Sequence, residues 1–313
     1  LVRIIKPLLP ALFANLSEFQ ANASGEVWID FHPGSALDFE GSLAVSEIPL
    51  DWLADVPPVR DIRTDLTGWY TPGSDWGARL QGFDFSWSDA EIEPLDLVFN
   101  QRLGSRWQDF DLSFNHLDLT VLTDLLGQSR IPSEQILAII DQMRPQGELD
   151  ALTLGHNEQG YFASMNLDAV DMQPYKGMPG VRGLSGYVEV NQQGGLFHVA
   201  DNDGFDVFFP KIYRDYLTVD SASGTTYMDW QAETETLTLR SEPVVASMDI
   251  GSSLIMYSVK QQLPAKGRPP EFNLVVGGRD LDAAYGNKYL PYKLPKNLSN
   301  WLETAVLGGN VKE

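Results

Sequence analysis

The sequence contains no cysteine and has few basic side chains. Without cysteine there are no disulfides, Cys-ligated zinc sites, iron–sulfur clusters or thiol nucleophiles. Only 22 Lys and Arg stand against 43 Asp and Glu, which gives a net charge of −21. Clustered Lys and Arg bind nucleic acid and anionic membrane surfaces. The charge balance therefore excludes nucleic acid as a partner and disfavours docking through a polybasic patch.

Long apolar runs are missing as well. The longest uncharged stretch near the N-terminus covers residues 7–17 and holds two prolines, whereas a membrane-spanning helix needs about 18 apolar residues. The layout of a signal peptide is also lacking. The chain starts at Leu1 and stops at Glu313 inside a repeated pattern, so we expect an internal piece of a longer protein. Its 43% hydrophobic content is high enough for a folded core.

An internal repeat is the most informative pattern. When the sequence is shifted by 122 residues, 10–95 align with 132–217 without a gap, and 14 of the 86 positions are identical. Average residue usage gives about five identities by chance. Phe39, Leu43 and Val45 fall on Tyr161, Met165 and Leu167. Strand phase is therefore kept, and a slip of one residue would have reversed the faces.

The spacing of the repeat predicts modules. Leu9-Pro10, Ile131-Pro132 and Leu294-Pro295 are each followed by a helical stretch and a Gly 14 or 15 residues after the Pro. We predict a first module over residues 1–131 with its opening helix at about 8–20, a second module over 132–294 with about 40 extra residues at 232–271, and the start of a third at 295–313.

Most of the remaining sequence alternates between apolar and polar residues with a period of two. This pattern is typical of antiparallel strands with one apolar and one wet face. We predict a mainly β fold, in which repeated antiparallel strands form a curved apolar groove with short helices at the module joints. A closed sandwich of two sheets is the alternative. The expected groove-lining residues are Val27, Ile29, Phe31, Leu37, Phe39, Leu43, Val45, Phe110, Leu112, Phe114, Tyr161, Met165, Leu167, Leu237, Leu239, Phe272, Leu274 and Val276.

Catalytic and metal-binding patterns are weak. The run from Asp201 to Asp206 resembles the start of a calcium loop, but Ile212 stands where the bidentate Glu belongs, so a β-turn is expected there. The four histidines, His32, His116, His156 and His198, show no metal-ligand spacing. No nucleophile elbow or phosphate-binding loop occurs. We expect a non-enzymatic protein without metal or cofactor.

Tryptophans supply the best rival function. An aromatic platform made by Trp69, Trp76, Trp87 and Trp107 would suit a β-sandwich carbohydrate-binding protein of the cell envelope. Against this, Trp107-Gln108 is repeated as Trp230-Gln231 at a shift of 123, as expected for residues that pack.

The tract Met178–Gly195, MPGVRGLSGYVEVNQQGG, and the pattern of Pro, helix, Gly and strand resemble the AsmA-like, YhdP-type envelope proteins of Gram-negative bacteria. The resemblance implies repeating β-groove units in the periplasm, attached to the inner membrane by other parts of the full-length chain. It implies transfer of phospholipid, or another acyl-chain lipid, toward the outer membrane. Further partners would be the inner-membrane anchor and outer-membrane contacts in those other parts. No catalytic residues are implied.

Overall fold

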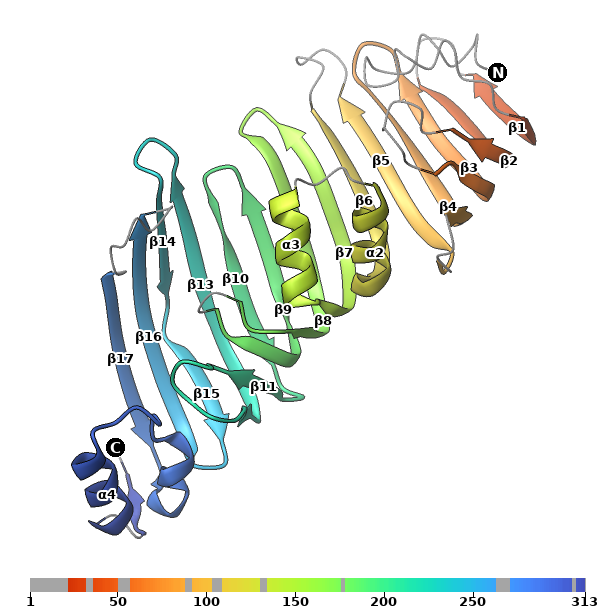
Figure 1. The fold of residues 1–313 in the computed structure, drawn as a ribbon. Coiled ribbons are helices and arrows are strands. Elements are labelled where there is room, and N and C mark those ends of the chain that lie inside the picture. Colours follow the sequence, from red (N-terminus) through yellow and green to blue (C-terminus); the bar gives the residue numbers. More distant parts are fainter. Residues whose placement is uncertain are drawn as a thin grey trace. The chain divides into compact units, whose positions relative to one another are not determined.

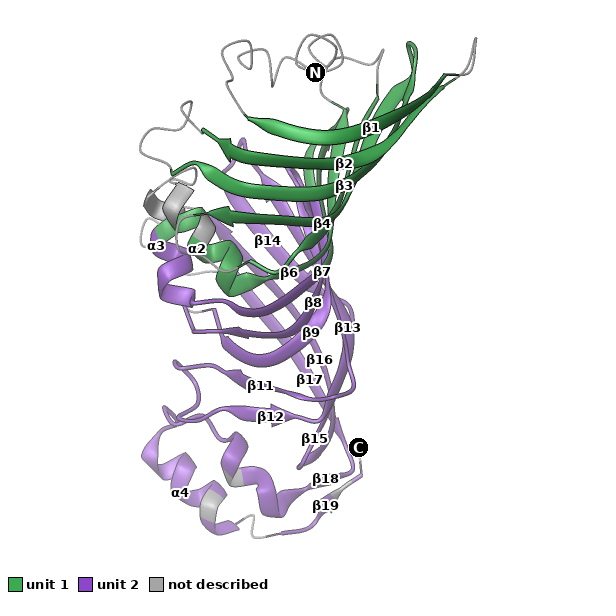
Figure 2. Cartoon of the chain, turned by 90° about the vertical axis from the view of Figure 1, so that its right-hand side faces the viewer, with its two compact units in different colours: residues 1–137, 150–162 green, residues 138–149, 163–313 purple. Residues whose placement is uncertain are grey.

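The computed structural model describes residues 22–31, 36–49, 57–87, 92–102, 109–129, 134–175, 178–262, 271–305 and 308–312. The protein is mainly β, with one antiparallel sheet of 17 strands, a further two-stranded sheet and a few short helices (Figure 1). The predicted antiparallel β class with few helices is confirmed. The chain divides into two compact units, residues 1–137 with 150–162 and residues 138–149 with 163–313 (Figure 2).

Unit 1 is built as an up-and-down meander in which each strand pairs with the next one in sequence. A short turn suffices between such neighbours. Between the third and fourth strands, for example, Gly73 takes a φ of +73° and the Ser74 N–H donates to the Thr71 carbonyl. The strands are β1 (Ala23–Phe31), β2 (Leu37–Ile48), β3 (Val59–Thr71), β4 (Asp75–Trp87), β5 (Leu95–Arg102), β6 (Phe110–Asp118) and most of β7 (Gln146–Asn157).

Unit 2 continues this plan with several interrupted strands. β9 pairs with both β10 and β11, and β13 pairs with both β14 and β15. Its strands are most of β8 (Gly160–Met172), β9 (Gly180–Asn191), β10 (Gly194–Asp201), β11 (Phe205–Phe208), β12 (Leu217–Val219), β13 (Ser221–Gln231), β14 (Thr236–Ser241), β15 (Val244–Met248), β16 (Gly251–Gln262), β17 (Glu271–Arg279), β18 (Leu281–Asp282) and β19 (Asn310–Val311).

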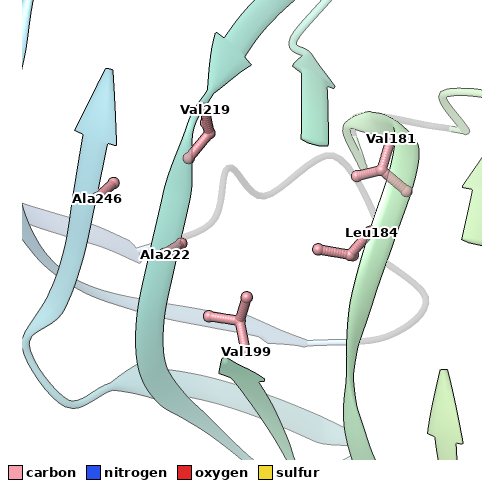
Figure 3. Packing of buried hydrophobic residues seen from close by; sticks show 6 residues of the cluster. All are labelled: Val181, Leu184, Val199, Val219, Ala222 and Ala246. Atoms are coloured by element: carbon pink, nitrogen blue, oxygen red, sulfur yellow. The ribbon is translucent and has the colours of Figure 1, made fainter. Parts of the chain in front are cut away.

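The buried core of unit 2 lies on a single face of its sheet. Partly buried side chains, Phe197 and Val244 among them, pack against this core. Small and β-branched side chains dominate, which suits close packing above a strongly bent sheet. Figure 3 shows the six core residues, Val181, Leu184, Val199, Val219, Ala222 and Ala246.

Three α-helices are described: α2 (Leu119–Ser129), α3 (Glu134–Met143) and α4 (Lys296–Ala305), with a 3-10 segment, η2 (Ala283–Tyr289). Asp118 caps α2, because its Oδ1 accepts the N–H groups of Thr120 and Val121 at 2.6 and 3.1 Å. None of the helices in the described ranges combines the length and apolar character needed to cross a bilayer. The opening helix predicted at about 8–20 lies outside the described residues.

β-Bulges bend the strands at positions that match across the repeat. Asp61 and Gly183, 122 residues apart, have φ values of +53° and +71°, and Gly82 and Gly204 have +56° and +86°. The bulged N–H groups of these three glycines are held by aspartates, with Gly82 bound to Asp96, Gly183 to Asp171 and Gly204 to Asp201, each at 2.8 Å. The repeat therefore preserves the bends of the sheet as well as its strand phase.

Ala169 of β8 takes a φ of +47°, a left-handed conformation that costs an L-residue about 1–2 kcal/mol. We expect Ala169→Gly to raise the free energy of unfolding by roughly 0.5–1 kcal/mol, because glycine relieves this strain but loses more entropy on folding. The matched control is Ala163→Gly in the same strand, where the backbone is not left-handed. That variant should instead lower stability by about 0.5–1 kcal/mol. Urea titration measures both, and two changes of the same sign would contradict the prediction.

Candidate functional site

One face of unit 1 is apolar across its whole width. Residues directly opposite each other on paired strands share a face. The register therefore links rows of side chains across β1 to β6. Two of these rows are Ile29–Phe39–Gly68–Ala78–Phe99–Leu112 and Val27–Gly41–Leu66–Leu80–Leu97–Phe114.

The unit 1 residues predicted to line a groove lie on this apolar face. Phe31 and Leu37 share the third row with Trp76 and Phe110, and Leu43 and Val45 extend the same parity along β2. The Tyr161 ring packs edge-on against the His156 ring, with the two ring centroids 4.6 Å apart. Tyr161 therefore lies on the same face as His156. Thr153 contacts Ser113, which lies on the polar face of the sheet. His156 is three residues after Thr153, so alternation along the strand places it on the apolar face.

Unit 2 has an apolar face of the same kind. Leu239 opposes Met228 and Val259, and Val259 in turn opposes Phe272. The predicted residues Leu237, Leu274 and Val276 belong to the same face through the pairs Trp230–Leu237, Tyr257–Leu274 and Ile255–Val276. Met165 and Leu167 alternate with Ser164, which hydrogen-bonds Tyr187 on the opposite face. Alternation therefore places both on the apolar side.

The opposite face of the unit 2 sheet is mostly polar. His198 Nδ1 lies 3.0 Å from Thr225 Oγ1, and the Tyr227 hydroxyl donates to Glu242 at 3.0 Å. Desolvation and then the hydrogen bond to Glu189 raise the pKa of Tyr187, and the Glu242 carboxylate raises the pKa of Tyr227. Polar contacts thus hold the outer side of the sheet while hydrocarbon occupies the other.

Among the described residues, side chains of the apolar face remain exposed. Phe31 and Phe272, at the edges of the two units, are 69% and 58% exposed, and Ile29 and Leu274 are 55% and 51% exposed. Among the predicted groove residues only Val45 is fully buried. In the described part of unit 1 the strands belong to one sheet, and in the described part of unit 2 only the two-residue strands β18 and β19 form a separate sheet. A closed sandwich would bury these side chains between two sheets about 10 Å apart. The arrangement is the open alternative.

Of the four tryptophans predicted to form a platform, the structure describes three, and Trp69 and Trp76 lie on opposite faces of the sheet. Trp76 lies on the apolar face, where its Nε1 donates to Gln101 Oε1 at 2.8 Å and its ring lies 5.0 Å from that of Phe99. Trp69 opposes Gly77 and therefore points from the other face of the sheet. Trp87 donates to the Pro57 carbonyl at 2.8 Å, and Trp107 lies outside the described residues. These positions fit packing roles.

The acidic run at Asp201 forms a bulge. Asp201 is 3% exposed and both of its carboxylate oxygens accept backbone N–H groups. Oδ1 accepts Asp203 and Gly204 at 3.0 and 2.8 Å, and Oδ2 accepts Ser185 at 3.0 Å. Among the described residues, no group of three or more His, Cys, Asp or Glu is placed to hold a metal ion. His32 lies outside them, and His116 Nδ1 sits 2.8 Å from Asp150 Oδ1.

Some features of the apolar face were missed by reading the sequence. Tyr70, Trp76, Leu97 and Phe99 of β3 to β5 belong to it by register. The alternation of Leu95, Leu97 and Phe99 would have revealed part of this set. Near the end of unit 2 the other face also exposes hydrocarbon, at Val245, Leu254, Met256 and Val275. Its strands are apolar on both parities there, so alternation gives no signal.

Comparison with known proteins gives one match. No curated protein and no solved structure matches the chain. A family model described as YhdP protein matches residues 4–313, almost the whole sequence. This match and the Pro–Gly module pattern point to the same family, and the chain therefore belongs to the YhdP family.

Proposed function

We propose that this chain is a segment of a periplasmic, bridge-like lipid transfer protein that carries phospholipid between the inner and outer membranes along its apolar sheet faces. The observation that supports the proposal is the uncovered apolar face, which extends across every paired strand from β1 to β6 in unit 1 and recurs in unit 2. Soluble domains rarely leave such a surface exposed unless something binds to it.

The energetics of lipid transfer require such a surface. A phospholipid has two chains of about 15 methylenes each, and exposing them to water costs about 0.8 kcal/mol per CH₂, or roughly 24 kcal/mol. A protein that moves the lipid must replace bilayer contacts with apolar side chains at every point of the path. Half-buried Phe, Leu, Met and Val side chains on one sheet face provide these contacts. The role is a non-enzymatic one.

The net charge of −21 supports the same role. The acidic residues lie mainly on the polar parity of the strands; Asp30 opposes Asp38 and Glu26 opposes Ser42, all on the side away from Phe39. This distribution keeps the outer face hydrated and repels anionic headgroups from it. Lipid is thereby directed to the apolar face. In the full-length protein, other parts would supply attachment to the inner membrane and contacts at the outer membrane.

Lipid that co-purifies with the chain tests the proposal. We expect native mass spectrometry of the protein, expressed in the bacterial periplasm, to show bound phospholipid. The delipidated protein should then take up a fluorescent phospholipid from vesicles. Buffer without protein and a soluble β-sandwich protein of similar size serve as controls. Absence of both bound lipid and uptake would overturn the proposed function.

A further inference from the structure

Three hydroxyl side chains interrupt the apolar face of unit 2. They are Thr226 of β13, Ser241 of β14 and Tyr257 of β16, and together we call them the hydroxyl cluster. Thr226 and Ser241 stand directly opposite each other. Thr226 Oγ1 lies 2.8 Å from the Tyr257 hydroxyl, and the Tyr257 N–H donates to Ser241 Oγ at 2.9 Å. The Thr226 and Tyr257 hydroxyls thus meet, and Ser241 lies on the strand between theirs.

Hydrocarbon surrounds the hydroxyl cluster. Two residues away along the strands lie Met228, Leu239 and Val259 in one direction and Ile255 in the other, where Val244 of β15 stands opposite Ile255. In the row of the cluster, Phe197 flanks Thr226 and Leu274 flanks Tyr257. Apolar surface therefore extends from the cluster on every side.

The cluster retains hydrogen-bonding capacity. Its three hydroxyls carry three protons, and the contact between Thr226 and Tyr257 uses one of them. Within the described ranges, the other two protons have no acceptor. None of the three side chains is fully buried, so these donors can be reached from the apolar face. They can serve an oxygen atom that approaches along that face.

The acceptor that fits best is uncharged. On the apolar face of β10 and β13 to β17, the described residues include a single charged side chain, Asp201. Its oxygens already accept backbone N–H groups. A phosphate would find no cation here. An ester carbonyl needs only O–H donors and has hydrocarbon attached beyond it, which matches the apolar surroundings.

We infer that the hydroxyl cluster is a subsite for the ester carbonyl of an acyl lipid. The inference rests on the proposed function. A uniform apolar face gives a hydrocarbon chain no preferred position, because dispersion contacts are non-directional. A pair of O–H donors fixes the ester at one point and lets the acyl chain extend over the neighbouring Met, Leu and Val side chains. The face then distinguishes acyl esters from ethers and free hydrocarbons.

Two matched probes test the inference. 1-Oleoylglycerol carries the ester carbonyl, and 1-O-oleylglycerol is the ether that lacks it but keeps the chain and the glycerol. Dissociation constants are measured with the delipidated chain. We expect the ester to bind about three- to tenfold more tightly than the ether, the effect of one or two ordinary hydrogen bonds. In the triple variant Thr226→Val, Ser241→Ala, Tyr257→Phe both probes should bind with the affinity of the ether.

The control variant is Thr238→Val, which removes a hydroxyl from the opposite face and should leave the ester-to-ether ratio unchanged. If the triple variant does not fold, Ser241→Ala alone takes its place, because it removes one of the two free protons, and the ester-to-ether ratio should then fall. Equal affinities for the two probes in the unmodified chain, or a ratio that persists in the variant, would overturn the inference. Failure of both probes and of phospholipid to bind would overturn the proposed function instead.

Discussion

Leu239→Asp should reduce lipid binding by on the order of 30-fold while unit 2 stays folded. Leu239 lies on the apolar face between Met228 and Val259 and is only half-buried. A bound acyl chain would complete its burial, which contributes about 2 kcal/mol, and a carboxylate there repels hydrocarbon. Because the site is open to water in the absence of lipid, the charge remains hydrated. We expect the free energy of unfolding to fall by no more than about 1–1.5 kcal/mol.

The two measurements are uptake of a fluorescent phospholipid and urea unfolding of the same preparation. Thr238→Asp, one residue earlier and on the polar face between Asp229 and Lys260, is the matched control and should bind lipid normally. A loss of stability above about 4 kcal/mol in Leu239→Asp would indicate a closed core. Unchanged lipid uptake in a folded Leu239→Asp variant would show that this face does not carry the lipid.

Asp201→Ala is expected to cause the largest loss of stability among the changes considered. The substitution removes the acceptor of three backbone N–H groups, from Ser185, Asp203 and Gly204. Asp201 is 3% exposed, so these donors lose their partner where water reaches them poorly. Unsatisfied partly buried groups cost about 1–3 kcal/mol each. We expect unit 2 to lose about 3 kcal/mol, or on the order of 10 °C in Tm.

Calorimetry of Asp201→Ala and of the exposed control Asp203→Ala distinguishes this structural role from a metal site. Asp203→Ala should leave Tm nearly unchanged because its N–H, which donates to Asp201, is retained. Millimolar calcium should not raise the Tm of the unmodified chain, since both oxygens of Asp201 are already engaged. A Tm that rises with calcium, or an Asp201→Ala variant as stable as the original, would contradict this account of the bulge.

The faces of the strands were predictable from the sequence because alternation survives across most of them. Phe39, Leu43 and Val45 on one parity of β2, and Phe110, Leu112 and Phe114 on one parity of β6, leave little choice about which side is apolar. The repeat strengthened that choice, since a shift of 122 residues keeps the same parity. The predicted groove residues of each unit accordingly share its apolar face.

The bends and the openness of the face were harder to predict. Gly82 and Gly204 hint at bulges, but Asp61, Ala151 and Ala169 also adopt left-handed φ values, and no local propensity favours that conformation for alanine. The question of an open face or a sandwich cannot be decided from alternation, because both arrangements place the same parity on apolar surroundings. The difference lies in whether a second sheet exists, which is a property of long-range pairing.

The nearest-neighbour connectivity of the strands has a consequence for how the chain acquires its structure. In unit 1 each strand from β1 to β6 finds its partner immediately before or after it in sequence. Contacts of short sequence separation close small loops and form quickly. The sheet can therefore form one hairpin at a time during synthesis of the chain, because pairing of these strands does not depend on a partner distant in sequence. Its length can change by whole hairpins without any rearrangement of the strands already in place.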